Sequence, residues 1–162
     1  MEQPSSEPPT IHELEIADLD SLIRILEEKK PDDRTDEEVD LFVSTIGQLK
    51  FLKEIESSDR VRELCQKLEF RHFECGLDIF RLKDEVDGIY VILKGMVDVY
   101  IPSKDLGAGE EEKCVARFVP VQLFGELSVV KGGLRKARIS TVEDSYFAYI
   151  SKEEYHSIME TG

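Results

Sequence analysis

The chain has 162 residues, of which 41% are hydrophobic and 35% are charged, and its formal net charge is −14. This balance is typical of one folded domain with a core and excludes a disordered chain. The negative charge disfavours nucleic acid and anionic membranes as partners, because phosphate groups are bound by clustered Lys and Arg. Without an apolar run of roughly 20 residues or a signal-peptide pattern, we expect a cytoplasmic protein without nucleic-acid or membrane partners.

Helix signals fill residues 10–67, after a polar lead-in at 1–9 that we expect to be disordered. Apolar residues recur there at the 3.6-residue spacing of an amphipathic helix. Pro31 ends the first helix, and a third, shorter helix is predicted from Ser58. The first two helices begin with capping boxes, in which a threonine is followed three positions later by Glu, at Thr10 with Glu13 and at Thr35 with Glu38.

Residues 68–150 change to the period of two that is typical of strands. We predict strands near Phe70 and Phe80 and over 89–93, 97–101, 114–119, 137–142 and 146–150. The acidic, Gly-rich stretch 103–112 is expected to be the tip of a hairpin. A capping box at Ser151 and Glu154 begins a helix over 151–162, which the end of the chain cuts short.

This order predicts an α+β fold: N-terminal helices, then an antiparallel β-roll of jelly-roll type, then a truncated C-terminal helix. We expect four segments, with bounds at 1–9 for the lead-in, 10–67 for the helices, 68–150 for the β-roll and 151–162 for the last helix.

The stretch from Phe124 to Thr141 interrupts the strand pattern. Gly125 allows a close approach of the backbone, and Glu126 begins a short helical turn whose exposed N–H groups suit an anion. Gly132-Gly133 then turns the chain back, so that Arg135 can point its guanidinium at the same place. The residues alone also allow Arg135 to be an ordinary surface ion-pair partner. Three apolar residues are expected to dock the turn on the core: Leu127, Val129 and Val130.

This stretch resembles the phosphate-binding cassette of the cyclic-nucleotide-binding domain family, whose members include regulatory subunits of cAMP-dependent kinase, nucleotide-gated channels and catabolite activators. Phe124-Gly125-Glu126-Leu127 and Arg135-Lys136-Ala137 match the two halves of the family pattern at a spacing that the family uses. The similarity spans about residues 38–160. It also implies a β-roll that carries a short phosphate-binding helix.

The resemblance implies cAMP or cGMP as the ligand, without a further cofactor or a metal. It implies that Glu126 accepts a hydrogen bond from the ribose 2′-hydroxyl and that Arg135 pairs with the cyclic phosphate. Backbone N–H groups near Leu127, Ser128 and Ala137 would complete the phosphate site. The expected binding residues are Phe124, Gly125, Glu126, Leu127, Ser128, Arg135, Lys136 and Ala137.

Three places depart from the family pattern, one of them being Val121-Gln122, which stands where the family has Gly-Asp. The turn Lys83–Asp87 lacks both of the glycines that are usual there. Lys136 stands where Ala, Ser or Thr is usual, which leaves the choice between cAMP and cGMP open, and we expect its side chain to point to solvent. The family also carries a further helix over the base, for which this sequence leaves no room after the helix at Ser151.

These features favour a regulatory module that senses a cyclic nucleotide and acts on an effector protein or a fused effector domain. The alternative is a degenerate domain that binds no nucleotide and serves in protein interaction. We expect neither an enzyme nor a metal site. The three histidines fall in separate elements, and the spacing of Cys65, His72 and Cys75 matches no zinc pattern.

Overall fold

A computed structural model describes residues 16–103 and 111–160 of the chain. The predicted lead-in, the capping box at Thr10 and Glu13, and most of the acidic loop lie outside these residues. Within them, no helix has the length and apolar character needed to cross a membrane. The N-terminal part is helical, with α1 at Ile16–Glu28, η2 at Pro31–Asp33, α2 at Asp36–Thr45, η3 at Ile46–Gln48, α3 at Lys50–Lys53 and α4 at Ser58–Gln66.

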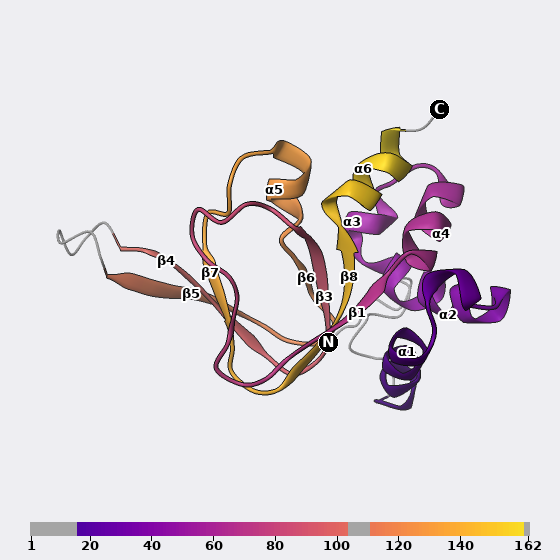
Figure 1. Cartoon of the computed structure of the whole chain (residues 1–162), viewed down its shortest axis with the longest axis horizontal. Coiled ribbons are helices and arrows are strands. Elements are labelled where there is room, and N and C mark those ends of the chain that lie inside the picture. The colour runs from indigo at the N-terminus through magenta and orange to yellow at the C-terminus, as the bar shows by residue number, and fades with distance from the viewer. Residues whose placement is uncertain (1–15, 104–110, 161–162) are drawn as a thin grey trace, which may run out of the picture.

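Among the described residues, eight strands then form two antiparallel sheets of four strands each (Figure 1). One sheet has the order β1 (Glu69–Phe73), β8 (Ser145–Ser151), β3 (Gly88–Lys94) and β6 (Leu123–Phe124). The other has the order β2 (Asp78–Phe80), β7 (Arg138–Thr141), β4 (Val97–Pro102) and β5 (Glu112–Phe118). The short helix α5 (Glu126–Lys131) joins β6 to β7, and α6 (Lys152–Glu160) follows β8. The predicted α+β fold with a β-roll is therefore confirmed.

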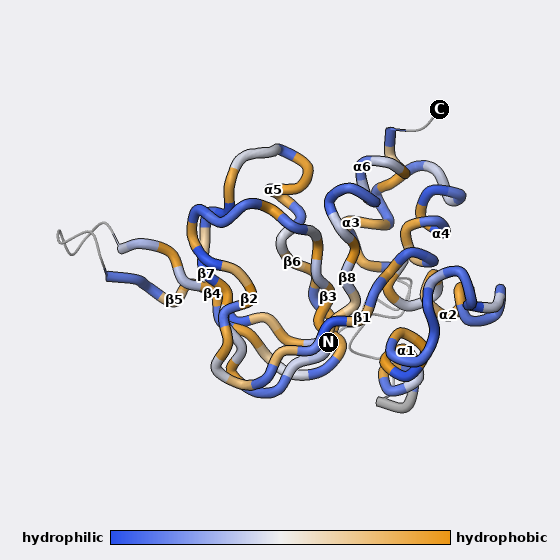
Figure 2. Tube along the Cα trace, in the orientation of Figure 1, coloured by the Kyte–Doolittle hydropathy of each residue, from blue (hydrophilic) through white to orange (hydrophobic). Residues whose placement is uncertain are grey.

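The sheet that contains β3 separates two apolar cores. Ile89, Val91 and Leu93 of β3 pack with the helices, while Tyr90 and Ile92 pack between the two sheets. Successive side chains of a strand point to opposite faces, so a strand with a core on each side is apolar throughout. Figure 2 shows hydrophobic residues in both the helical layer and the sheets.

The helix starts follow the side-chain chemistry of the sequence. Thr35 and Glu38 form the predicted capping box, with the Glu38 amide donating to the Thr35 hydroxyl at 3.1 Å and the Thr35 amide to the Glu38 carboxylate at 2.9 Å. Helix α4 begins at Ser58 as predicted, but its capping residue is Ser57, one position earlier. These caps fix where the helices that cover the β1–β8–β3 sheet begin.

Candidate functional site

A pocket of about 520 Å³ opens between α5 and the interior of the β-roll. All eight residues that the sequence singles out line it. Its other walls are apolar except for one lysine at the end of α5. They comprise Phe80, Val99, Phe118, Leu123, Lys131, Gly132 and Ile139. The structure thus brings the two halves of the predicted motif, which are separated in sequence by the helix and the loop, to one cavity.

Arg135 is the anchor of this pocket and is only 2% exposed. Its Nη2 donates to the Asp87 carboxylate at 2.8 Å and to the Gly88 carbonyl at 2.6 Å, and its Nη1 donates to the Gly125 carbonyl at 2.9 Å. The guanidinium also lies 3.8 Å from the centre of the Phe80 ring. Its Nε is buried and has no partner among the described residues. The Arg135 guanidinium is therefore fixed by three hydrogen bonds and by the Phe80 ring, while its buried Nε donor makes no hydrogen bond to the described residues.

The backbone of Arg135 is hydrogen-bonded to the turn that follows β2. The Lys83 amide donates to the Arg135 carbonyl at 2.8 Å, and the Arg135 amide donates to the Asp84 carbonyl at 2.9 Å. Lys83 has a positive φ of 74°, a conformation that favours glycine. The glycine that is missing from this turn has therefore been replaced without loss of the turn, because Lys83 adopts the backbone conformation that glycine would take.

Asp87, which pairs with Arg135, is itself oriented by two buried tyrosines. The Tyr90 hydroxyl donates to the Asp87 carboxylate, and the Tyr149 hydroxyl donates to the Asp87 carbonyl at 2.9 Å. Burial, and then the hydrogen bond to Asp87, raise the pKa of Tyr90, while burial and the charge of Asp87 raise the pKa of Tyr149 to about 12. Both hydroxyls therefore stay protonated and able to donate near neutral pH.

Gly125 and the short helix α5 shape the wall next to Arg135. Gly125 has a φ of 87°, and a Cβ at this position would lie 3.1 Å from Nη1 of Arg135, so a side chain there would crowd the guanidinium. Of the three apolar residues that we expected to dock this helix, only Val129 does so, at 2% exposed. Leu127 is 62% and Val130 is 51% exposed, because a helix of one and a half turns can bury only one narrow face.

The remaining predicted residues lie at different depths of the pocket. Phe124 is buried and stacks on Tyr90, with ring centres 5.3 Å apart. Glu126 and Ser128 are half-buried, and the Glu126 carboxylate has no ion-pair partner among the described residues. Lys136 is exposed, as expected, yet it lines the pocket. Ala137 is half-buried on the way into β7.

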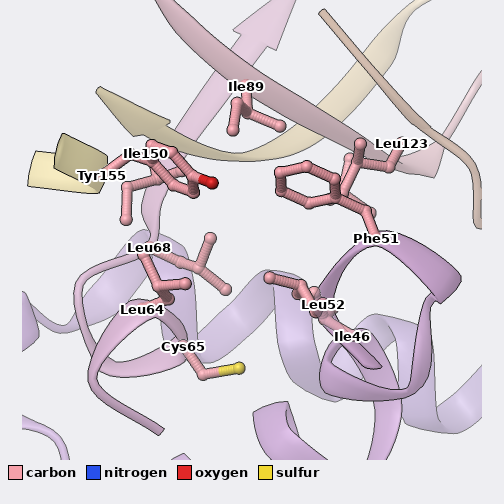
Figure 3. A pocket seen from close by; sticks show the side chains of 11 residues that line it. Ile46, Phe51, Leu52, Leu64, Cys65, Leu68, Ile89, Leu123, Ile150 and Tyr155 are labelled. Carbon is pink, nitrogen blue, oxygen red and sulfur yellow. The ribbon is translucent and has the colours of Figure 1, made fainter. Parts of the chain in front are cut away.

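A second, smaller cavity of about 20 Å³ lies between the helices and the sheet, and Figure 3 shows its eleven lining side chains. It has room for about one water molecule, and its walls are almost wholly apolar. It includes Cys65, whose thiol has its pKa raised to about 12 by burial and is therefore unreactive. Among the described residues, no group of three or more metal-ligating side chains is present. The pocket at α5 is thus the better candidate site.

Sequence reasoning missed Asp87, Phe80 and Lys131 as parts of this site. Asp87 and Phe80 are 48 and 55 positions from Arg135, and local patterns do not report such contacts. One signal was present for Asp87. The turn in which both glycines are replaced keeps the Asp of the pattern, and this Asp is the ion-pair partner of Arg135.

Comparisons with known proteins identify the family and the fold of this chain. Residues 70–161 match the family model described as the cyclic nucleotide-binding domain. The chain is 30% identical over 169 aligned residues to the Rap guanine nucleotide exchange factor 3 of Homo sapiens. This alignment covers 96% of this chain and 17% of that protein. The chain spans between 12% and 17% of the length of four curated relatives that it matches.

Two solved structures show the same fold. One is the regulatory subunit of a cAMP-independent protein kinase A from Trypanosoma brucei, a mutant bound to cAMP, with a TM-score of 0.62, 23% identity, and coverage of 86% of this chain and 44% of that chain. The other is the corresponding subunit from Trypanosoma cruzi bound to guanosine, with a TM-score of 0.64, 20% identity, and coverage of 75% and 41%.

Proposed function

This chain belongs to the family of cyclic nucleotide-binding domains, and we propose that it binds cAMP or cGMP in the pocket at α5 and signals this to an effector. The observation that carries the proposal is the buried Nε of Arg135, which has no partner among the described residues. Buried donors in folded proteins are nearly always paired. A phosphate oxygen is the acceptor that best matches a guanidinium, so the cyclic phosphate is the natural partner.

The other residues of the pocket suit the remaining parts of such a ligand. The half-buried Glu126 carboxylate is available to accept a hydrogen bond from a ribose hydroxyl. The apolar wall formed by Val99, Phe118 and Ile139 offers a surface for the base. A micromolar ligand needs about 8 kcal/mol of binding free energy, and a charge-assisted hydrogen bond supplies about 1.5–3 kcal/mol. Base burial and backbone N–H groups near Ser128 and Ala137 therefore have to add to Glu126 and Arg135.

A route from the pocket to the helices runs through α5 and α6. The His156 ring on α6 lies with its Nε2 3.1 Å from the Val129 carbonyl of α5. Tyr155, which precedes His156 on α6, packs on Phe51 of α3 with ring centres 6.0 Å apart. A shift of α5 on binding would therefore displace groups that contact α6 and, through it, α3. Ligand drives such a shift only by binding two arrangements unequally. The effector, separate or fused, is part of this proposal.

Isothermal titration calorimetry with cAMP and with cGMP tests the proposal. We expect saturable binding to the wild type for at least one of the two nucleotides. Glu126→Gln removes the acceptor charge but keeps the shape, and we expect about tenfold or weaker binding. Arg135→Lys keeps a charge but loses the fork of donors, and we expect a loss of about 10–100-fold.

Glu143→Gln is the matched control for Glu126→Gln, because Glu143 is exposed and is not part of the pocket. It should bind like the wild type. Thermal melts of each variant check that the fold is intact, which matters most for the buried Arg135. No heat with either nucleotide up to millimolar concentration would reject the sensor and favour the degenerate interaction module. Binding that is unchanged in both site variants would reject this pocket.

A further inference from the structure

Two lysines at the mouth of the pocket have no role in the function described so far. Lys131 ends α5, Lys136 follows Arg135, and both line the pocket. Both are exposed, and neither makes a hydrogen bond or ion pair with another described residue. They flank a loop that contains Gly132 and Gly133, with φ angles of 86° and 93°. Helix α5 and this loop lie at one end of the roll (Figure 1).

Lys136 is turned back over this loop. A Cβ built on Gly133 would lie 3.9 Å from the Lys136 ammonium, so the exposed charged end of Lys136 lies close to Gly133 in the loop. Lys131 lines the same pocket from the other end of the loop. Two like charges around one mouth, unpaired within the described residues, repel each other unless an anion lies nearby.

Arg135 alone does not give the pocket a positive charge. Its guanidinium is paired with Asp87 at 2.8 Å, and Glu126 adds a further carboxylate. Without the two lysines, the pocket together with the Asp87 carboxylate behind Arg135 would have one cation and two carboxylates. With them it has three cations and two carboxylates, and so one net positive charge. This local charge stands in a chain whose net charge is −14, which repels anions at long range.

We propose that Lys131 and Lys136 determine ligand specificity, because they make the pocket prefer a singly charged nucleotide to the neutral nucleoside that shares its base and sugar. This inference rests on the proposed function and deepens it. The phosphodiester of a cyclic nucleotide brings one negative charge, which the net charge of the pocket matches. Much of the pocket wall is apolar, and an uncompensated charge beside such a wall is costly.

Calorimetric titration with cAMP and with adenosine tests this inference, in the wild type and in the double variant Lys131→Gln with Lys136→Gln. We expect the wild type to bind cAMP more tightly than adenosine. In the double variant we expect cAMP binding to weaken by about tenfold and adenosine binding to change by less than about twofold. The dependence of cAMP affinity on NaCl concentration should also become shallower, because two screened attractions are gone.

The double variant Lys53→Gln with Lys113→Gln is the matched control. Both of these lysines are exposed and lie outside the pocket, and the change in total charge is the same. It should bind both probes as the wild type does. If the wild type binds cAMP but the pocket variant binds it equally well, or the control weakens it as much, this inference fails and the proposed function stands. If the wild type does not bind cAMP, the same comparison is made with cGMP and guanosine, and if it binds neither cyclic nucleotide, both the inference and the proposed function fail.

Discussion

At the scale of single residues, Arg135 holds parts of the fold together through its intramolecular contacts, without a ligand. It pairs with Asp87, caps two backbone carbonyls and covers the Phe80 ring. Asp87 in turn is oriented by Tyr90. An arginine held in this way loses little conformational entropy when a phosphate binds, which favours affinity. The same contacts mean that a change at Arg135 affects stability as well as binding.

Lys83 gives a prediction at this scale. It holds a φ of 74° in the turn that clasps Arg135, and a non-glycine residue in this region is strained by about 1–2 kcal/mol. Lys83→Gly should therefore raise the free energy of unfolding by about 0.5–1 kcal/mol, after the entropy cost of glycine. Urea denaturation followed by circular dichroism measures it.

Lys83→Ala is the control for this prediction, because it removes the side chain and keeps the backbone strain. It should change the free energy of unfolding by less than about 0.5 kcal/mol. If Lys83→Gly is no more stable than Lys83→Ala, the positive φ of Lys83 does not strain the backbone, and the prediction is wrong.

The sequence identified Glu126 and Arg135 because both belong to one short motif with a fixed spacing. It did not identify Asp87 as the ion-pair partner of Arg135, although this ion pair helps to orient the guanidinium. A contact between residues 87 and 135 depends on the register of β3 in the sheet and on the turn at Lys83, and neither leaves a local pattern. The direction of the Lys136 side chain is likewise a property of the folded loop.

At the scale of elements, the strands divide into those that the sequence could predict and those that it could not. Strand β3 was predicted, because a short apolar run bounded by glycines is typical of a strand buried on both faces. Strand β6 was not, because Leu123–Phe124 has only two residues and pairs through Tyr90 and Val91 of β3. Helix starts were predictable where a capping side chain is present, as at Thr35.

Two glycines in different elements should respond differently to substitution. A Cβ on Gly88 at the start of β3 would lie 2.3 Å from the Ile150 carbonyl and 2.6 Å from the Tyr149 ring, with no room to move. We expect Gly88→Ala to cost about 3 kcal/mol of unfolding free energy, at the upper end for an overpacked core.

Gly76→Ala is the comparison, since a Cβ there meets nothing within 4 Å and only the positive φ of 83° is unfavourable. It should cost about 1 kcal/mol. Urea denaturation of both variants measures the difference. Equal losses would contradict the packing of β3 against β8 at Gly88.

At the scale of the whole molecule, one apolar cluster joins the helices to the sheet that carries the site. It contains Leu22 of α1, Phe42 of α2 and Leu64 of α4 together with Val91 of β3 and Ala148 of β8. The helices are therefore part of the core and not an appendage to the β-roll. A shift of α5, if ligand binding produces one, would therefore act on a molecule whose layers share side-chain contacts.

The buried tyrosines and Cys65 predict how stability depends on alkaline pH. Burial raises the pKa of Cys65 from 9.0 to about 12, and burial with the charge of Asp87 raises that of Tyr149 from 10.0 to about 12. Between these values the folded chain holds more protons than the unfolded chain. These groups should therefore make their full contribution to the free energy of unfolding below about pH 9. The free energy of unfolding should then fall as the pH rises toward 12.

Urea denaturation at pH 8, 10 and 11 checks this expectation. Tyr149→Phe removes one of the titrating groups, so its stability should fall less steeply above pH 10 than that of the wild type. Stability that stays constant from pH 8 to pH 11 would contradict the burial of these groups.

The central claim is that a cyclic nucleotide occupies the pocket at α5. Titration of ¹⁵N-labelled protein with cAMP, followed by amide chemical shifts, tests it most directly because it reports binding and place together. The account predicts saturable shifts that are largest at Gly125, Ser128 and Ala137, which line the pocket, and small at Lys53 and Lys113, which do not. The absence of shifts up to millimolar concentrations of cAMP and, in a second titration, of cGMP, or saturable shifts centred elsewhere, would contradict it.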